Sequence, residues 1–500
     1  MELLDHLALG FSVALTPVNL LYALIGTLLG TLIGVLPGIG PVATIAMLLP
    51  TTFTLPPVSA LIMLAGIYYG AQYGGSTTSI LLNMPGETSS AVTCLDGYQM
   101  ARQGKAGAAL AIAALGSFFA GCVSTVMIAT VAVPLSTLAL KFGPAEYCSL
   151  MVLGLIGAVV LARGSILKAV AMVVLGLLLG IVGTDVNSGA ARFTFGIAEF
   201  ADGIGVVSVA MGLFGFAEII SNLESAEKRE IFTTKITGLW ITRDQFRQAW
   251  PAVLRGTGLG SVLGLLPGGG ALLASFASYA LEKKIAADPS RFGKGAIEGV
   301  AGPESANNAG AQSSFIPLLT LGIPENAVMA LMVGAMTIHS IQPGPQVMTS
   351  NPALFWGLIA SMWVGNLMLV ILNLPLIGMW VKLLQVPYRV LYPAILLFCA
   401  IGVYTTSNAP FDVIQTAFFG FVGVLFLKLE CEPAPLLLGF VLGPMMEENL
   451  RRALLISRGD PSVFVTRPLS LAMLITAAVL LVLIIAPAFR KTREQAFQET

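Results

Sequence analysis

GTLLGTLIGVLPGIG (residues 26–40) and GTGLGSVLGLLPGGG (residues 256–270) are two versions of one unusual stretch of sequence. They align without a gap, and nine of the fifteen positions are identical. Each is an apolar run that ends in Leu-Pro-Gly-x-Gly. This ending interrupts a helix, because proline lacks a backbone donor and glycine adopts conformations that other residues avoid. The recurrence predicts two related halves, each built around an interrupted apolar segment.

The composition is that of a membrane protein. The chain of 500 residues is 56% hydrophobic and only 10% charged, whereas a soluble domain is about 25% charged. No Asp, Glu, Lys or Arg occurs between His6 and Gly86, and residues 468–489 form a second charge-free run. Because about 20 apolar residues suffice to cross a lipid bilayer as a helix, we expect an all-α polytopic membrane protein. The net charge of zero gives no reason to expect nucleic acid as a partner.

Basic residues predict on which side of the membrane the loops lie. The two polar intervals 222–250 and 282–308 hold nine Lys and Arg residues, which places both in the cytoplasm by the positive-inside rule. Residues 251–281 lie between them, and their second apolar arm is about 16 Å long, too short to cross. We therefore expect a re-entrant hairpin at 251–281. Residues 1–101 hold no Lys or Arg, so the equivalent hairpin, 18–55, is expected to enter from the opposite side.

Five apolar passes between the hairpins would invert one copy relative to the other. These passes are 58–84, 106–133, 144–162, 165–183 and 201–221. The expected organisation is an N-terminal interfacial segment, a first inverted repeat, a cytoplasmic linker, a second inverted repeat, and a loop with a C-terminal transmembrane helix: residues 1–17, 18–223, 224–247, 248–450 and 451–500. One conflict stays open, because this count puts the loop 447–468 outside although it holds four arginines.

A second shared signal follows each hairpin. Gly-Ala-Gln is followed by hydroxyl residues and then by a proline near a glutamate. These landmarks are 70–72, Pro85 and Glu87 in the first half, and 310–312, Pro324 and Glu325 in the second. We expect each set to mark a broken transmembrane helix, at 58–84 and at 309–341.

Interrupted helices at membrane depth are tolerated where they line a buried or wet site, with helix N-termini facing anions and free carbonyls facing cations. The substrate-binding candidates are the tip glycines and the residues of the two polar runs: Gly38, Gly40, Gln72, Tyr73, Gly75, Ser76, Thr77, Thr78, Gly268, Gly270, Asn307, Asn308, Gln312, Ser313 and Ser314. The cation-coupling candidates, with sodium expected at the hairpin tips and broken helices, are Asn83, Pro85, Glu87, Glu304, Thr320 and Glu325.

Each group of candidates also has a simpler interpretation. Single glycines serve close helix packing, and serine and threonine hydroxyls bond back to their own helix. The three glutamates could sit at solvated helix ends rather than inside the membrane domain. We find no nucleophile–base pair and no paired-histidine motif, so we expect neither an enzyme nor a cofactor.

Four runs resemble the large membrane subunit of the tripartite tricarboxylate transporters, the TctA family. They are GVLPGIGPVATIAMLLP (34–50), YGAQYGGSTTSILLNMPGE (69–87), GLLPGGGALLASFASYALEKK (264–284) and GVAGPESANNAGAQSSFIPLLTLGIP (299–324). The resemblance covers about residues 10–465. It implies a multi-pass secondary transporter of the bacterial inner membrane. It also implies two partners, a small four-helix membrane subunit (TctB-like) and a periplasmic solute-binding protein (TctC-like).

Substrates of the family are citrate and other carboxylates, taken up with sodium ions or protons. Neither polar run of this chain holds a Lys or Arg. A carboxylate would thus be held by hydroxyls, amides and helix N-termini, with bound cations offsetting the cost of burying its charge. An elevator-like movement of the hairpins is expected by analogy alone. A passive carboxylate channel and an intramembrane enzyme are the alternatives.

Overall fold

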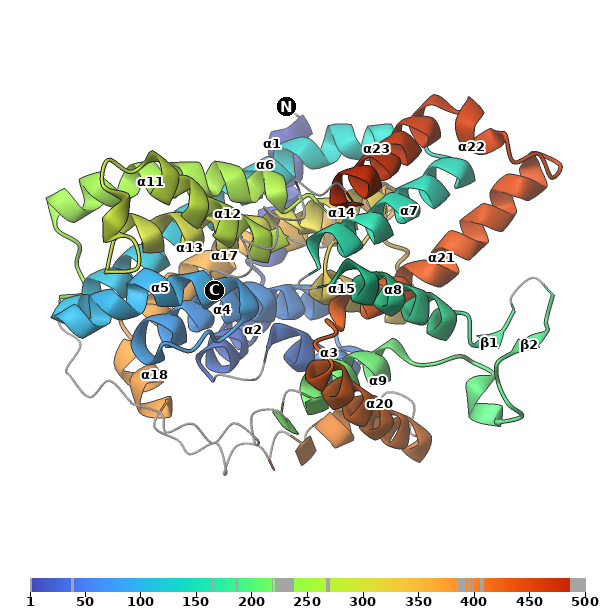
Figure 1. The fold of residues 1–500 in the computed structure, drawn as a ribbon, viewed down its shortest axis with the longest axis horizontal. Helices are drawn as coiled ribbons and strands as arrows, with labels where there is room; N and C mark the ends of the chain where they lie inside the picture. Colours follow the sequence, from blue (N-terminus) through green and yellow to red (C-terminus); the bar gives the residue numbers. More distant parts are fainter. Residues whose placement is uncertain are drawn as a thin grey trace.

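The computed structural model describes residues 2–36, 40–162, 165–185, 188–217, 219–220, 238–266, 270–384, 393, 396–397, 399–404 and 409–485. The described chain is almost entirely helical, as expected for an all-α polytopic membrane protein (Figure 1). Within the described residues, four helical stretches are long and apolar enough to cross a membrane: Pro17–Val35, Thr88–Ala139, Pro352–Asn373 and Pro410–Lys428. The predicted fold class is confirmed at this level.

The first half contains the following elements: α1 (Glu2–Ala14), α2 (Pro17–Val35), α3 (Pro41–Thr52), α4 (Pro57–Leu82), η1 (Thr88–Ser90), α5 (Ala91–Met100), η2 (Ala101–Lys105), α6 (Ala106–Ala139), α7 (Pro144–Leu161), α8 (Ile166–Gly180), β1 (Gly183–Thr184), β2 (Ala191–Arg192), η3 (Ala198–Phe200), α9 (Val206–Ala210) and η4 (Met211–Phe216). The two short strands pair antiparallel, with Gly183 opposite Arg192.

The second half contains these elements: α11 (Arg243–Leu263), α12 (Gly270–Ile285), η5 (Pro289–Arg291), α13 (Glu298–Ser313), α14 (Phe315–Leu321), α15 (Ala327–Ile338), α16 (Val347–Ser350), α17 (Pro352–Asn373), α18 (Ile377–Leu383), α20 (Pro410–Lys428), α21 (Ala434–Ile456), α22 (Val463–Thr466) and α23 (Pro468–Ile485). The apolar segment expected at 390–407 lies largely outside the described residues.

The helix of each glycine-rich stretch packs closely against a second helix, and the two packed pairs are similar. In each half, three glycines four residues apart share one helix face and meet the backbone of a neighbouring helix: Gly26, Gly30 and Gly34 of α2 face α4, and Gly256, Gly260 and Gly264 of α11 face α13. A Cβ added at Gly30 would lie 2.9 Å from Cα of Gly70, and one at Gly260 would lie 2.8 Å from Cα of Ala306. These six glycines, which are not among the candidate site residues, therefore serve close helix packing.

The helices are interrupted after the polar runs, and not within them as the prediction of broken helices implied. Helix α4 is continuous from Pro57 to Leu82 and ends at Asn83, which has a φ of 57°. In the second half α13 passes almost directly into α14, which ends at Gly322 with a φ of 75°, and α15 begins at Ala327. Residues 83–87 and 322–326 are therefore the two non-helical connections. Each carries one of the predicted glutamates.

At one end of the molecule, ion pairs connect segments that are far apart in the sequence. Arg451 lies 2.9 Å from Asp185, and Arg192 lies 2.7 Å from Glu447, which joins the β1–β2 hairpin to α21. Arg467 lies 2.7 Å from Glu146 at the start of α7. Figure 1 shows β1, β2 and α22 at one end of the long axis and α5 with α11 towards the other.

The opposite end is held together by the loops that we expect in the cytoplasm. Gln103 donates to the carbonyl oxygen of Lys294 at 2.7 Å. The buried carboxylate of Asp96 accepts backbone N–H groups from Gly295 at 2.7 Å and Ala296 at 2.8 Å. Helix α6 runs between the two ends, and its 34 residues give a length of about 51 Å.

This arrangement bears on the arginine-rich loop 447–468. It lies at the end opposite to the basic residues of 282–308, as the count of passes requires. Arg451, Arg452 and Arg467 are each paired with a carboxylate. The positive-inside rule counts Lys and Arg whether or not they are paired with carboxylates, so the conflict between these arginines and the count of passes stays open. Helix α21 also extends to Ile456, well beyond the apolar run 433–446.

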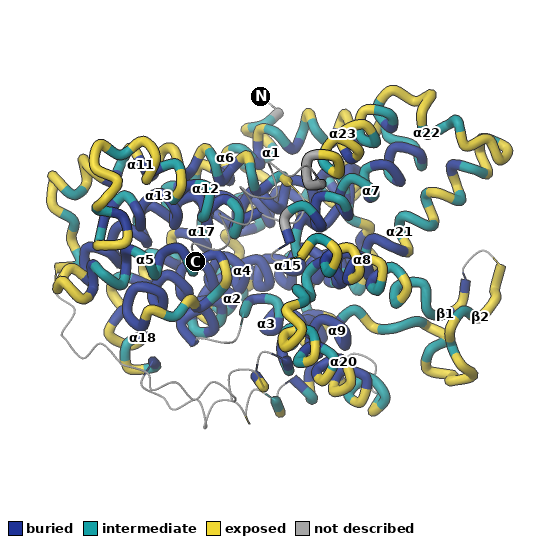
Figure 2. Tube along the Cα trace, in the orientation of Figure 1, coloured by how far each residue is buried: buried dark blue, intermediate teal, exposed yellow. Residues whose placement is uncertain are grey.

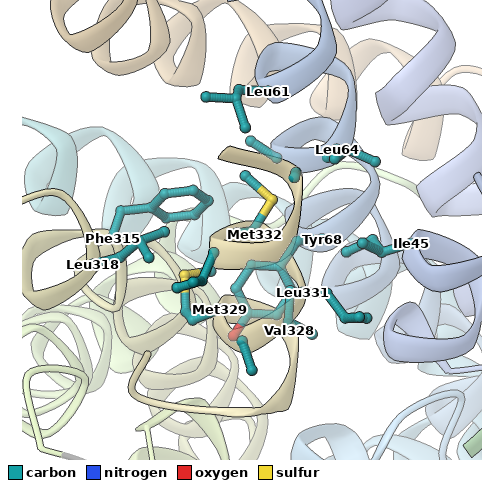
Figure 3. Close-up of a cluster of buried hydrophobic side chains, with 14 of the residues drawn as sticks. Ile45, Leu61, Leu64, Tyr68, Phe315, Leu318, Val328, Met329, Leu331 and Met332 are labelled. Carbon is teal, nitrogen blue, oxygen red and sulfur yellow. The ribbon is translucent and has the colours of Figure 1, made fainter. Parts of the chain in front are cut away.

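The most deeply buried part of the molecule lies between α4, α14, α15 and α17 (Figure 2). Its apolar core includes Leu61, Leu64, Phe315, Leu318 and Met332, which are almost fully buried. Figure 3 shows the aromatic ring of Tyr68 among these side chains, close to Val328 and Leu331 of α15. The polar runs of α4 and α13 therefore stand beside a packed apolar core, which holds them in place.

Candidate functional site

A group of polar side chains from both halves meets between α4, η1, α5 and α13. We call it the polar cluster, and its members are Gln72, Ser76, Glu87, Ser89, Thr93, Glu304 and Asn307. All except Glu87 are at most 4% exposed, and Glu87 is half-buried. The two polar runs identified in the sequence therefore do face each other in the fold.

Glu304 is the buried centre of one side of this cluster. Its carboxylate accepts the hydroxyl of Ser76 from α4 at one oxygen and the hydroxyl of Thr93 from α5 at the other. The side chain is 0% exposed. Glu304 is therefore not a solvated helix end, which was the simpler interpretation of its sequence position.

Asn307 stands one helical turn from Glu304 and reaches Glu87. Its side-chain nitrogen donates to Oε1 of Glu87 at 3.1 Å. With its amide nitrogen facing the acceptors, Gln72 donates to Oδ1 of Asn307 at 2.8 Å and to Oε2 of Glu87 at 3.0 Å. Ser89 also donates to Glu87. This carboxylate thus collects donors from both halves of the chain.

Two further contacts surround the cluster. Asn308 donates to the hydroxyl of Ser117 on α6 at 2.7 Å. Tyr73 donates to Oδ1 of Asn366 on α17 at 3.2 Å. Helices α6 and α17 therefore complete the polar environment that α4 and α13 begin.

The second non-helical connection, 322–326, forms polar contacts of its own, apart from the polar cluster. Glu325 is fully buried, and its Oε2 accepts from the side-chain nitrogen of Asn326 at 2.7 Å. The same nitrogen lies 3.1 Å from the Tyr68 hydroxyl of α4. Gly270, with a φ of 21°, stands against the carboxylate, and a Cβ there would lie 2.8 Å from its carboxyl carbon. Among the described residues, neither Oε1 of Glu325 nor a side-chain polar atom of Gln312 has a hydrogen-bond partner, and all three atoms are buried.

Most of the predicted hydroxyl ligands bond to nearby backbone. Thr77, Ser314 and Thr320 donate to carbonyls of their own helices. Thr78 also reaches the carbonyl oxygen of Val35 at 2.9 Å, and Ser313 reaches that of Gly260 at 3.4 Å. Thr78 and Ser313 therefore each connect a polar run to the helix of a glycine-rich stretch, α2 and α11 respectively.

Several predicted residues stand outside the cluster. Asn83 and Pro85 are exposed at the end of α4. Gly75 packs against Glu87, where a Cβ would lie 2.8 Å from Cγ of the glutamate. Gly40 precedes the first residue of α3. Gly38 and Gly268 lie outside the described residues, so the hairpin tips stay a prediction.

Sequence reasoning missed Ser89, Thr93, Ser117, Asn326 and Asn366. Ser89 and Thr93 follow Glu87 closely and could have been found as a continuation of the first polar run. Asn326 directly follows Glu325. Ser117 and Asn366 are lone polar residues in apolar helices and carried no signal that set them apart from surface or packing residues.

The cluster is rich in carboxylates and lacks their usual partners. No Lys or Arg occurs in residues 68–101 or 295–341. Among the described residues, Glu87, Glu304 and Glu325 form no ion pair with a basic side chain. Buried ionised carboxylates are costly without a compensating charge. Such a group can bind a cation or a proton, and its hydroxyls and amides can bind a polar substrate.

Cavities open towards both ends of the molecule. A cavity of about 1040 Å³ lies at the β1–β2 end, and its wall includes Leu321, Ala330 and Val333 beside the connection 322–326. A second cavity, of about 390 Å³, lies at the opposite end and is lined by Lys105, Arg291 and Lys294. Both are large enough for a small organic ion.

Comparison with known proteins gives close relatives. A protein of Agrobacterium vitis, described as an uncharacterized 52.8 kDa protein in the TAR-I ttuC' 3' region, is 60% identical over 499 residues, which span all of this chain and 99% of that protein. A second protein of the same organism, from the TAR-II ttuC' 3' region, is 62% identical over 240 residues, covering 48% of this chain and 99% of that protein. No solved structure matches significantly.

The sequence profile of a transporter family matches residues 20–438. That span includes most of α2, all of α3, α4 and α11 to α15, and the whole polar cluster. The family is one of transporters and not of enzymes. The chain is therefore a member of the tripartite tricarboxylate transporter TctA family.

Proposed function

We propose that the chain is the transport subunit of a tripartite system that takes up citrate-like tricarboxylates or related carboxylates across the bacterial inner membrane. Uptake is driven by a sodium or proton gradient. A periplasmic solute-binding protein delivers the substrate, and a small four-helix membrane subunit completes the complex. Family membership supports the class of function, and the polar cluster supports the coupling.

One observation supports cation coupling: Glu87 and Glu304 each accept hydrogen bonds from residues of the opposite half of the chain. Glu304 of α13 accepts from Ser76 and Thr93, and Glu87 accepts from Asn307. A movement of one half against the other would break these contacts and change the environment of both carboxylates. Their affinity for a cation or proton would change with it, which is the requirement for coupling to transport.

The arrangement also suggests how an anion is held without a basic side chain. Amides and hydroxyls of the cluster can donate to a carboxylate, and a bound cation can offset its charge. The wall of the cavity at the β1–β2 end includes Leu321, which directly precedes the connection 322–326 and its buried Glu325. This cavity gives a substrate arriving from that end a path towards the site.

Reconstitution tests this proposal directly. The chain, the small membrane subunit and the binding protein are placed in liposomes, and labelled citrate and other carboxylates are supplied outside. An inward sodium or proton gradient is expected to drive accumulation above equilibrium. Flux that only equilibrates the two sides would instead identify a passive channel.

A further inference from the structure

A small, partly open space lies between α4, α6 and α17, next to the polar cluster, and Leu110, Ala113 and Ala114 form its apolar lining. Its volume is about 10 Å³, which is room for a single water-sized particle. Its polar lining consists of Tyr73, Ser76, Thr77, Ser117 and Asn373. None of these side chains carries a formal charge. We call this space the α4–α6–α17 void.

The hydroxyl hydrogens around the void are already engaged elsewhere. Ser76 donates to Glu304 or to the carbonyl oxygen of Gln72 at 3.0 Å. Thr77 donates to the carbonyl oxygen of Tyr73 at 3.5 Å. The Tyr73 hydroxyl in turn donates to Asn366. Each hydroxyl has one hydrogen and two lone pairs, so acceptor capacity is what remains for the void.

The other two side chains follow the same pattern. Ser117 accepts from Asn308 at 2.7 Å and donates to the carbonyl oxygen of Glu304 at 3.5 Å. Asn373 uses its nitrogen on the carbonyl oxygen of Leu369 at 2.9 Å. Its Oδ1 is buried and has no hydrogen-bond partner, and the residue is 4% exposed.

A void lined by acceptors has a preference for what fills it. An unpaired buried oxygen costs about 1–3 kcal/mol unless something donates to it or binds it. A cation can satisfy several oxygens at once, whereas one water offers two hydrogens. The carboxylate of Glu304 lies one hydroxyl away, through Ser76. Its negative charge favours a cation in the void.

We infer that the α4–α6–α17 void is a binding site for one dehydrated alkali-metal cation, held by oxygens of Ser76, Thr77, Ser117 and Asn373. This inference rests on the proposed function, since it assigns the coupling ion to a place. Ser76 and Thr77 belong to 58–84, one of the segments where the sequence led us to expect sodium, whereas Ser117 and Asn373 come from α6 and α17, which the sequence did not single out. Ser76 links it to Glu304, so occupancy of the void and the charge of that carboxylate are coupled.

The test measures binding apart from transport. The thermal midpoint of the purified chain in lipid nanodiscs is recorded against sodium chloride, with choline chloride keeping ionic strength constant, and lithium and potassium chloride are compared. Sodium is expected to raise the midpoint in a saturable manner. Thr77→Val and Asn373→Leu are each expected to weaken this effect by about tenfold or more in apparent Kd.

Ser361→Ala is the matched control, because Ser361 is buried on α17 and donates only to the carbonyl oxygen of Leu358 at 2.7 Å. It is expected to keep the sodium response of the original chain. Equal stabilisation by choline and sodium would overturn the inference and leave water as the occupant. A sodium response that both variants keep would overturn it too. A sodium response lost in the variants supports the site even if no carboxylate uptake is found, in which case only the proposed function fails.

Discussion

Asn307 donates to Oε1 of Glu87 across 3.1 Å, and the two residues come from opposite halves of the chain. Asn307 lies on α13, whereas Glu87 lies in the connection that follows α4. The contact therefore depends on how the halves are placed against each other. Any change in that placement alters the donors available to the half-buried carboxylate of Glu87.

Replacing Asn307 tests whether this contact belongs to the transport site. Asn307→Ala removes the donor to Glu87 and the acceptor of Gln72. The loss of a buried partner costs about 1–3 kcal/mol, which is roughly ten- to hundredfold in affinity. Uptake of labelled carboxylate in the reconstituted complex is expected to fall by about this factor, with the protein still inserted.

Ser305→Ala serves as its control on the same helix. Ser305 is buried, and its hydroxyl has no hydrogen-bond partner. Removing an unsatisfied hydroxyl is neutral or stabilising, so uptake is expected to stay unchanged. Equal loss in both variants would mean that α13 tolerates no substitution, and equal retention would exclude Asn307 from the site.

Glu304→Gln tests which residue carries the coupling charge. The amide keeps the size of the side chain and one acceptor oxygen but removes the negative charge that faces Ser76 and Thr93. Accumulation driven by a cation or proton gradient is expected to be lost. Exchange of labelled for unlabelled carboxylate across the membrane is expected to persist at a reduced rate.

Glu298→Gln is the comparison, since Glu298 begins the same helix but pairs with Arg291 at 2.8 Å near the surface. Surface ion pairs contribute about 0–1 kcal/mol, so gradient-driven uptake is expected to continue. Full accumulation by the Glu304→Gln variant would assign coupling to another group.

The sequence predicted the helices and the meeting of the two polar runs, because apolar length and charge depletion are strong local signals. Helix α6 begins at the expected residue, Ala106. Gln72 of the first polar run and Asn307 of the second are neighbours in the fold. Physical patterns along the chain were enough for these features.

Other features depend on packing that no local pattern encodes. The break expected within 58–84 comes after Leu82, since the polar residues of α4 are satisfied by other helices and leave its backbone intact. Thr93 was overlooked because a single threonine in α5 looks ordinary until Glu304 is placed beside it. Asn373 and Ser117 gain significance only from the void that they line.

The assignment of the two ends of the molecule to opposite sides of the membrane predicts which positions a thiol reagent can label from outside. Ala190→Cys and Pro461→Cys, in a background without the five cysteines, lie near the ion pairs of Asp185 and Arg467. Ala287→Cys lies at the opposite end, beside the basic residues of α12. All three positions are exposed. An impermeant thiol reagent applied outside the cell is expected to label the first two and not the third.

The control is the same labelling after the membrane is permeabilised, when all three are expected to react. Labelling of Ala287→Cys from outside would reverse the assigned orientation. Labelling of Ala190→Cys and Pro461→Cys from different sides would contradict the fold, because ion pairs join their segments.

The packing of the glycines on α11 predicts that valine substitutions at Gly258 and Gly260 have different effects on stability and uptake. Gly260 meets the backbone of α13, where a Cβ would lie 2.8 Å from Cα of Ala306, whereas Gly258 has no atom within 4 Å of its added Cβ. Backbone cannot yield as a flexible side chain can, so Gly260→Val must push α11 away from α13 and displace Ser313, which bonds to the carbonyl oxygen of Gly260.

Overpacking of this kind costs about 1–3 kcal/mol or more, so Gly260→Val is expected to lower the thermal midpoint in nanodiscs and to abolish carboxylate uptake. Gly258→Val makes the same chemical change on the same helix, and it points away from α13. Its midpoint and uptake are expected to stay near those of the original chain. If the two variants behaved alike, close contact between α11 and α13 would not be what the glycines provide, and their role would have to be sought in backbone conformation at the hairpin instead.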